Sequence, residues 1–478
     1  MSRDGPGERL GPASMGCRHP GGIYKGTLRL GSPMPAHGTP ARRGKGDGTD
    51  YWARYQELFP RYFWSEETRL ASIIVTGAKG SRVRDTSGKT YIDLTSQWAT
   101  NNLGNVPPEV LEVTVEALRR YGFLTYFMTP HLPMIELAER LIENRPSPNL
   151  SRVFLELSGT GAAEGAVKHA VEASHRPLIL SFLGQYHGLS IGTNLIGSLS
   201  SHERRYWEAW GGGALHAPYP FPYRRPPGMS EQEYGDWVLE YIEEQILGRQ
   251  AEPDRIAGVI FEPVACEAGI WIPPAKFVRG LAKLCETHDW FFIDDEVETG
   301  LGRTGKMWAI EHFGVAPDLM AIGKGISGGV MPIAAVMGTE EVMGEAMVAA
   351  GTTFAGHPAA CAAASKTLEI LRRDKIPERS ARLGAAALRH MKEWERLPNV
   401  GEVRGLGLCL GIELVKDKRS RKAHAELGRR VFRDCVQNGT IPLWNYGDNV
   451  IRIEPPLTIE QETLDAGLDT VESALRRS

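Results

Sequence analysis

Residues 316–329 read APDLMAIGKGISGG, a short apolar run that ends in one lysine, Lys324, with glycines on both sides. The apolar run indicates a buried strand, and a lysine at its end is costly unless the amine has a partner or a role. The flanking glycines let a flat ligand approach the backbone closely. This combination suits an amine that forms a Schiff base with an aldehyde. Taken alone, however, the stretch is better interpreted as a solvated lysine in a glycine-rich loop.

The composition is that of an ordinary globular protein and excludes several classes. The chain has 478 residues, a formal net charge of -3 and 42% hydrophobic residues, which gives no support for nucleic-acid or membrane binding. No apolar run is long enough to span a bilayer. The six cysteines show no CxxC pair and no metal-ligand spacing, so we expect reduced thiols, no metal site and a cytoplasmic protein.

The order of apolar runs predicts an α/β fold in two domains. From residue 152 onward, short β-like runs alternate with amphipathic segments, which indicates a largely parallel sheet covered on both faces, with ligands beyond the carboxyl ends of its strands. We expect a disordered Gly-, Pro- and Arg-rich tail over 1–49, a large domain over 96–345, and a small domain from 50–95 and 346–478. The expected strands of the large sheet include 153–155, 178–182, 256–261 and 290–293, with helices at 162–173 and 275–287.

Three motifs follow predicted strands. Residues 157–164 read LSGTGAAE, where backbone N–H groups and the Thr160 hydroxyl form a candidate phosphate cup, although an ordinary helix N-cap looks similar. Residues 185–188 read QYHG, in which Tyr186 fits a ring stacked on a flat cofactor or a core tyrosine equally well. The third motif, residues 291–300, reads FFIDDEVETG and ends a buried strand in carboxylates, which need cations nearby.

The acids of the third motif allow three hypotheses. A magnesium site is disfavoured, because adjacent residues on a strand point to opposite faces. Residues 300–305 read GLGRTG, a dinucleotide fingerprint, and residues 300–306 nearly spell a P-loop. Met307 replaces the hydroxyl residue that a P-loop needs, and the acids interrupt the strand-to-glycine junction of a dinucleotide site. The third hypothesis pairs one buried aspartate with a protonated ring nitrogen.

Several ordered motifs together resemble the class III aminotransferases, pyridoxal-phosphate enzymes of fold type I. The resemblance extends from about Tyr51 to the end of the chain. It implies a large domain with a mostly parallel sheet flanked by helices, and a smaller α/β domain from the N- and C-terminal parts. The motifs are DEVETGLGRTG at 295–305, PD at 317–318, GKG at 323–325, TFAGHP at 353–358, RGLG at 404–407 and PPL at 455–457.

The resemblance implies pyridoxal 5'-phosphate as the cofactor and assigns roles around its ring. Lys324 is expected to bond to the cofactor aldehyde, and Asp295 to keep the pyridine nitrogen protonated, which makes the ring an electron sink. Val297 is expected on one face of the ring and Tyr186 on the other, with His187 close by.

The resemblance also implies a phosphate site and a homodimer with shared active sites. Gly159 and Thr160 are expected to bind the cofactor phosphate, and Thr353 to reach the phosphate in the partner subunit. Glu262, in the sequence FEP, matches an acid of the family near the cofactor.

The chain departs from the family pattern at several positions. Gly161 stands where the family usually has Glu, Glu298 stands where Gln is common, and residues 104–108 (GNVPP) replace the usual Gly-His-x-His-Pro. His357 in place of Asn resembles the branch that acts on ω-amino acids and amines. These departures put the substrate range in question more than the cofactor.

Four residues are candidates for contact with the substrate. Trp98, Tyr126 and Phe127 lie in segments that border the pocket in relatives, although Trp98 fits a packing role equally well. Arg452 is a candidate for a substrate carboxylate through paired hydrogen bonds, and a structural surface arginine is at least as good an interpretation.

The predicted reaction is ping-pong transamination between an amine or amino-acid donor and a keto acid such as pyruvate or 2-oxoglutarate. The motifs leave a racemase, aminomutase or decarboxylase of the same family open, because the bond that breaks depends on which one lies perpendicular to the ring. A catalytically inactive homologue that serves as a binding protein is a further alternative.

Overall fold

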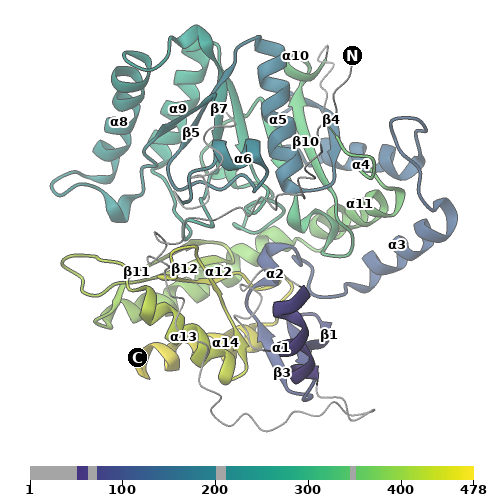
Figure 1. The fold of residues 1–478 in the computed structure, drawn as a ribbon, viewed down its shortest axis with the longest axis vertical. Coiled ribbons are helices and arrows are strands. Elements are labelled where there is room, and N and C mark those ends of the chain that lie inside the picture. The colour runs from purple at the N-terminus through teal and green to yellow at the C-terminus, as the bar shows by residue number, and fades with distance from the viewer. Residues whose placement is uncertain (1–50, 63–72, 201–211, 345–350, 478) are drawn as a thin grey trace, which may run out of the picture.

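The computed structural model describes residues 51–62, 73–200, 212–344 and 351–477 and has two parts. One part contains a seven-stranded sheet and the other contains two four-stranded sheets. Figure 1 shows the large sheet with its helices above the smaller part. The expected tail over 1–49 lies outside the described residues. Among the helices in the described ranges, none has both the length and the apolarity needed to cross a membrane.

The large sheet is mostly parallel, as predicted. Strands β9, β8, β7, β5 and β6 are parallel neighbours, and β10 is antiparallel to both β9 and β4, so β4 points the same way as the others. The sequence interpretation did not identify β10 or β6. In spatial order the strands are β4 (Leu150–Glu156), β10 (Ala334–Thr339), β9 (Leu319–Ile322), β8 (Phe291–Asp295), β7 (Ile256–Phe261), β5 (Leu178–Phe182) and β6 (Ala214–Ala217).

Helices cover both faces of this sheet because its strands are apolar on both sides. Alternate residues of β8 show this: Phe292 packs in the cluster that includes Phe277 of α9, and Ile293 packs in the cluster that includes Ala166 of α5. Figure 1 shows α5 and α9 beside the strands, with α8 packed on α9. The helices are α5 (Gly159–Ser174), α6 (Ile191–Ile196), α8 (Glu231–Tyr241), α9 (Ala275–His288) and α10 (Glu340–Met343).

The second part combines segments from both ends of the described chain. Its first sheet has the order β1-β2-β3-β13, in which β13 from the C-terminal region is parallel to β3. This pairing confirms the predicted small α/β unit of N- and C-terminal parts. Its elements are β1 (Val75–Lys79), β2 (Arg82–Asp85), β3 (Thr90–Asp93), α12 (Ile376–Lys392), β11 (Val400–Leu406), β12 (Cys409–Leu414), α13 (Ala425–Gln437), β13 (Thr440–Ile441), β14 (Leu443–Trp444), β15 (Val450–Ile453) and α14 (Gln461–Arg477).

Five further helices complete the described fold, and one of them links the two parts. Helix α11 packs against α3, α4, α12 and the short turn η7 (Lys324–Ser327), which follows β9. Helix α11 begins after the boundary expected at 345/346, yet it packs against elements on both sides of that boundary. The domain boundaries expected at 95/96 and 345/346 therefore stay predictions. The helices are α1 (Tyr51–Tyr62), α2 (Ser96–Ala99), α3 (Pro108–Tyr121), α4 (Leu132–Glu143) and α11 (Pro358–Arg373).

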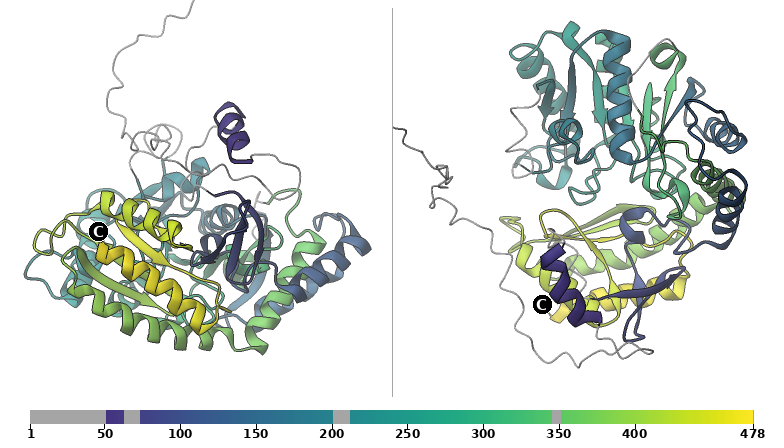
Figure 2. Two further views of the ribbon diagram at one scale, coloured as in Figure 1. Left: turned by 90° about the horizontal axis from the view of Figure 1, so that it is seen from below. Right: turned by 45° about the vertical axis from the view of Figure 1, so that its right-hand side comes forward.

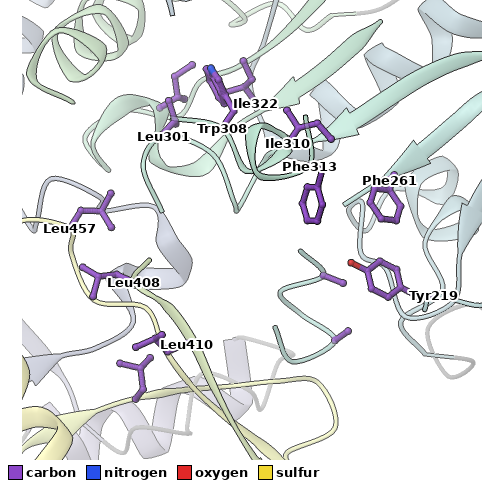
Figure 3. Close-up of a cluster of buried hydrophobic side chains, with 14 of the residues drawn as sticks. Tyr219, Phe261, Leu301, Trp308, Ile310, Phe313, Ile322, Leu408, Leu410 and Leu457 are labelled. Atoms are coloured by element: carbon purple, nitrogen blue, oxygen red, sulfur yellow. The ribbon is translucent and has the colours of Figure 1, made fainter. Parts of the chain in front are cut away.

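One hydrophobic cluster runs through both parts. Figure 3 shows Phe261 and Ile322 of the large sheet together with Leu408, Leu410 and Leu457 from the second part. The loop after β8 contributes Leu301 and Trp308 to the same cluster. The right view of Figure 2 shows the two parts one above the other along this boundary. The ends of the large strands that face the second part are therefore held in a fixed position.

Arg303 anchors this boundary with hydrogen bonds to three separate segments. Its side chain is fully buried and donates to the carbonyl oxygens of Leu408 at 3.1 Å and Pro455 at 2.6 Å. It also donates to Ser96 Oγ at 3.1 Å and Asn102 Oδ1 at 2.6 Å. A buried guanidinium is stable only with such a set of acceptors, so Arg303 depends on both parts being docked.

We expect Arg303→Ala to lower the free energy of unfolding by about 3–5 kcal/mol, because four buried acceptors lose their donor and a cavity is left. Chemical denaturation followed by tryptophan fluorescence measures the change. The matched control is Arg152→Ala, which removes an exposed pair with Glu340 and should cost less than about 1 kcal/mol. Equal losses in the two variants would contradict this account.

Candidate functional site

The candidate site lies where five strands of the large sheet end on the same edge. Glu262 directly follows β7, and Asp295 is the last residue of β8. Lys324 comes two residues after β9, His187 follows β5, and Gly159 follows β4. Carboxyl ends of parallel strands meet at one edge, which is the usual place for ligands in such sheets. The structure therefore brings together residues that are up to 165 positions apart.

Lys324 is held at the start of a turn. Its φ of 45° lies in the left-handed region, which is costly for a residue other than glycine and is common at functional positions. Its amine donates to a carboxylate oxygen of Glu298. Burial disfavours the charged lysine, but the carboxylates of Glu298 and Glu267 outweigh burial and raise its pKa. The amine is therefore partnered, which excludes the solvated-lysine interpretation.

Asp295 is fixed by a histidine and by its own backbone turn. Its Oδ2 lies 2.7 Å from His187 Nδ1, and its Oδ1 accepts from the Val297 N–H at 3.1 Å. The neighbouring Glu262 accepts from the Tyr186 N–H at 2.6 Å. Burial and the nearby charge of Asp295 raise the pKa of Glu262 well above its usual range. Burial and proximity to Asp295 therefore both favour the neutral form of Glu262.

A glycine-lined surface lies between these residues. A Cβ on Gly159 would lie 2.4 Å from a methyl group of Val297, and a Cβ on Gly323 would lie 3.1 Å from the Gly159 Cα. A Cβ on Gly188 would lie 2.5 Å from the Thr160 hydroxyl. These positions favour glycine, because a Cβ at Gly159 or Gly188 would overlap the Val297 or Thr160 side chain and one at Gly323 would press on the Gly159 backbone. The start of α5 adds N–H groups that suit an anion.

Arg452 forms the centre of a buried ion cluster that the sequence interpretation missed. It is fully buried in β15 and donates to Glu298, to Glu267 at 2.9 Å and to Glu454 at 2.8 Å. Burial lowers the pKa of Arg452, but these carboxylates outweigh it and raise the value. Two features of the sequence could have indicated this cluster. Glu298 stands where Gln is common, and acids at positions 267 and 454 interrupt apolar stretches.

Trp98 lies on a left-handed turn beside Lys324. Residues 96–99 all have φ between 45° and 60°, a conformation that costs about 1–2 kcal/mol per residue. The turn is stabilised by Ser96 Oγ, which donates to the Glu454 carbonyl at 2.6 Å. It packs against η7, so that a Cβ on Gly325 would lie 3.2 Å from the Ala99 carbonyl. The Trp98 ring is 42% exposed and meets Trp444 edge-on at 5.5 Å.

The remaining predicted residues gather around the segment over 351–357. A Cβ on Gly356 would lie 2.8 Å from the Tyr126 ring, and a Cβ on Gly351 would lie 2.7 Å from the Phe127 ring. The Tyr126 hydroxyl donates to the Leu155 carbonyl at 3.4 Å. Thr353, in the same segment, is exposed in the single chain. The substrate and cofactor roles of these residues stay predictions.

The competing hypotheses for the acidic stretch do not fit the geometry. Asp295 bonds to His187, Glu298 to Arg452, and Glu296 to the Ile310 N–H at 2.8 Å, so the acids do not converge on one point. Burial raises the pKa of Glu296 to about 8. The glycine loop packs on protein, since a Cβ on Gly305 would lie 2.9 Å from the Ala381 Cβ. That loop therefore serves packing between the two parts.

The donor set suits a cofactor with an aldehyde, a basic ring nitrogen and a phosphate. Lys324 supplies an amine, Asp295 supplies a buried anion, and the glycine-lined surface with the start of α5 supplies N–H groups for a phosphate. A thiol, metal or dinucleotide site would require a different set of groups.

Comparisons with known proteins agree with this chemistry. The family model for aminotransferase class-III matches residues 63–475. A leucine/methionine racemase of Thermococcus litoralis is 34% identical, with 88% of this chain and 94% of the relative covered. A probable 4-aminobutyrate aminotransferase of Bacillus subtilis is also 34% identical, over 90% of this chain and 98% of the relative.

A solved structure shows the same fold. An amine transaminase from an uncultivated Pseudomonas species, in a form bound to pyridoxal phosphate, superposes with a TM-score of 0.82 at 28% identity, over 87% of this chain and 98% of that chain. The resemblance stated from the motifs is confirmed, and so is fold type I. The chain belongs to the class III aminotransferases, enzymes that depend on pyridoxal 5'-phosphate.

Proposed function

We propose that this enzyme moves an amino group from an amine, or from an α-, β- or ω-amino acid, to a keto acid such as pyruvate or 2-oxoglutarate in a ping-pong reaction. The observation that supports this most directly is the Lys324 amine at the carboxyl edge of the sheet, with the buried acid Asp295 ending the neighbouring strand. The amine matches the aldehyde of pyridoxal phosphate, and the anion matches its ring nitrogen.

Two residues carry the reaction in this proposal. Pyridoxal phosphate, when bound, supplies an electron sink for the pair released at the substrate carbon. Lys324 Nζ would hold the cofactor at its aldehyde and, when free, would carry the proton taken from the donor carbon. Asp295 would keep the ring nitrogen protonated. His187 is a positioning residue, because its 2.7 Å contact fixes the Asp295 carboxylate.

Further residues hold the cofactor by shape and hydrogen bonding. We assign Val297 and Tyr186 to opposite faces of the ring, and the Tyr186 backbone is fixed by Glu262. Gly159 and Thr160, at the start of α5, bind the phosphate through N–H and hydroxyl groups. The close packing of Gly159 on Val297 supports this, since it ties the phosphate site to the ring site.

We also propose a homodimer in which Thr353 reaches the phosphate of the partner's cofactor. Exposed apolar side chains near this segment form an aromatic patch: Phe354 follows Thr353 in the chain, Phe123 lies against Phe354, and Phe127, with Met128 next in sequence, lies near Gly351. Phe354 is 55% exposed and Met128 is 83% exposed, and the Phe123 and Phe354 rings are 4.6 Å apart. A contiguous exposed apolar patch favours association with another protein surface. The five described cysteines carry free thiols, which supports the proposed cytoplasmic location.

We expect Phe354→Asp to convert the dimer into a monomer and to weaken retention of pyridoxal phosphate, because a charge in the aromatic patch opposes its burial. Sedimentation velocity and cofactor absorbance after dialysis measure the two effects. Phe354→Leu keeps the patch apolar and should remain dimeric. A wild-type chain that sediments as a monomer, with cofactor bound, would refute the shared site.

The substrate residues in this proposal are Trp98, Tyr126, Phe127 and Arg452. Trp98 has the most support, because its exposed ring belongs to the turn that packs on Lys324. An aromatic wall there favours an apolar or aromatic donor. Arg452 is a candidate for a substrate carboxylate, although its present partners are all carboxylates of the chain.

A racemase is the second candidate, because the Thermococcus litoralis relative bears that name. The same lysine and aspartate serve both reactions. In a racemase the proton returns to the original carbon on the opposite face, whereas in a transaminase it passes to the cofactor.

Spectroscopy on the protein loaded with pyridoxal phosphate separates these outcomes. A single amine donor should convert the cofactor lastingly to its pyridoxamine form, and pyruvate should restore it. Inversion of leucine without a lasting conversion would favour the racemase. No cofactor absorbance at all would favour an inactive binding homologue. A panel of donors against pyruvate and 2-oxoglutarate then identifies the substrate pair.

A further inference from the structure

Cys266 and Cys409 come from the two different parts of the chain and lie in contact in the interior. Cys266 belongs to the loop over 262–274 that follows β7 of the large sheet, and Cys409 is the first residue of β12 in the second part. Their Sγ atoms are 3.7 Å apart, although 143 positions separate the two residues in the sequence. Both side chains are fully buried, so bulky reagents do not reach the pair.

The loop that carries Cys266 is bound to the second part on either side of the thiol contact. Arg404 of β11 donates to the Gly269 carbonyl at 2.5 Å and to the Ile270 carbonyl at 2.9 Å. The backbones of Cys266 and Cys409 are therefore held close together whenever the two parts are docked. Two thiols held in van der Waals contact need only small side-chain rotations to form a bond.

The hydrogen bonds of the pair run in series from Cys266 to Glu454. The Cys409 thiol donates to Glu454 Oε1 at 3.4 Å, which leaves the Cys409 sulfur to accept from the Cys266 thiol. Burial raises the pKa of Glu454, so its carboxylate is a stronger base than that of an exposed glutamate.

Of the two thiols, Cys409 loses its proton more readily. A hydrogen bond from Cys266 and the charges of two arginines lower the pKa of Cys409, but burial and the charge of Glu454 outweigh them and raise it. The hydrogen bond to Cys409, together with burial, raises the pKa of Cys266 well above its usual range. Cys409 is therefore the better nucleophile, with Glu454 as the base beside it.

A metal ion is the alternative occupant of this cluster. The ligand atoms of Cys266, Cys409 and Glu454 all lie within 4.8 Å of one another. A structural zinc site takes four ligands, whereas this cluster offers three within the described ranges of the chain. One of the three, Glu454, already binds the Arg452 guanidinium at 2.8 Å. The contacts therefore favour a bond between the two sulfurs over a metal site.

We propose that Cys266 and Cys409 form a reversible disulfide when the protein meets hydrogen peroxide, and that this bond crosslinks the two parts of the chain. The Cys409 thiolate attacks one peroxide oxygen, the O–O bond breaks, and the released hydroxide takes the Cys409 proton from Glu454 to become water. The Cys266 sulfur then attacks the sulfenic sulfur of Cys409. The S–O bond breaks, and the oxygen leaves with the Cys266 proton as a second water.

This sequence balances without any further reagent. Two thiols lose two electrons and two protons, and one peroxide is reduced to two waters. The disulfide is independent of the proposed amino transfer, because neither sulfur takes part in that reaction.

Peroxide treatment of the cofactor-loaded wild type, followed by alkylation and peptide mass spectrometry, tests the proposal. The peptide that contains Cys266 should be joined to the peptide that contains Cys409. The midpoint of thermal unfolding should rise by about 5 °C, because the crosslink closes a loop of 143 positions in the unfolded chain. A phosphine reductant should separate the peptides and restore the original midpoint.

Three variants serve as controls. Cys409→Ala removes the nucleophile and should show neither the joined peptides nor the shift in midpoint. Cys266→Ala should leave a sulfenic acid on Cys409, which dimedone labels when it is added together with denaturant. Cys285→Ala removes another buried thiol, in α9, and should keep both the crosslink and the shift.

Three results would overturn the proposal. The first is the absence of the joined peptides in wild-type protein treated with enough peroxide to oxidise a small dithiol fully, including the case in which Cys409 reaches the sulfonic acid instead. The second is a joined pair without any rise in the midpoint, because the bond would then not hold the two parts together. The third is one metal ion per chain in the purified protein that is lost in Cys409→Ala, which would assign the cluster to metal binding.

Discussion

Replacing Lys324 by alanine is expected to abolish amino transfer, with a loss of roughly 10³-fold or more, because the variant has neither the bonding amine nor the group that moves the proton. The remaining contacts at Asp295 and Gly159 should still bind the cofactor without a covalent bond. Borohydride reduction of the wild type, followed by peptide mass spectrometry, should find the cofactor attached at Lys324. The variant should show no attachment.

Lys306 offers a matched control for this experiment. It also lies next to a glycine and is the lysine that a P-loop interpretation would select, yet it is exposed and its amine donates to the Glu311 carbonyl at 2.8 Å. Lys306→Ala should retain covalent attachment and turnover. Near-normal activity in Lys324→Ala would refute the assignment of this lysine.

Asp295→Asn is expected to lower kcat by roughly 10²–10⁴-fold, because an amide cannot stabilise a positive charge on the ring nitrogen, and a neutral ring is a weaker electron sink. The His187 contact should survive, since an amide can still bond to the imidazole. Cofactor binding should therefore fall much less than turnover, and the two are measured by absorbance titration and by steady-state kinetics.

The adjacent Asp294 provides the control for Asp295. It is fully buried on the same strand, and burial raises its pKa well above the usual range, which favours the neutral carboxyl. Asp294→Asn exchanges one neutral group for another of the same shape and should leave turnover nearly unchanged. If both variants lose activity equally, the loss reflects damage to β8 and not the charge on Asp295.

Strands that are identified by a local apolar run agree with the structure, whereas a strand that depends on tertiary pairing was missed. The strand predicted over 178–182 matches β5 (Leu178–Phe182), and that over 256–261 matches β7, because a continuous apolar run is sufficient to identify a strand buried on both faces. Strand β10 was missed, although its residues are apolar. Nothing local indicates that it inserts between β4 and β9 in the opposite direction.

The site residues also divide into those that local sequence predicts and those that tertiary contacts determine. The positions of Lys324, Asp295 and Gly159 at strand ends could be predicted, since one sheet edge collects the ends of all parallel strands. The left-handed turn over 96–99 could not, because its cost is offset by contacts such as Ser96 to Glu454, 358 residues away. Arg452 was a candidate for a substrate carboxylate or a structural surface arginine; it is buried, not on the surface, and its guanidinium faces three acids of the chain.

The amino-acid sequence by itself indicated the parallel α/β sheet through its apolar runs, and it indicated the cofactor and the proposed lysine, Lys324, through motifs that resemble the class III family. Only the tertiary structure decided the electrostatic setting of that lysine. Glu298 lies 26 residues from Lys324 and 154 from Arg452, and its contact with Arg452 exists only when the two parts of the chain are docked. Charge interactions depend on distance in space, which a sequence pattern does not contain.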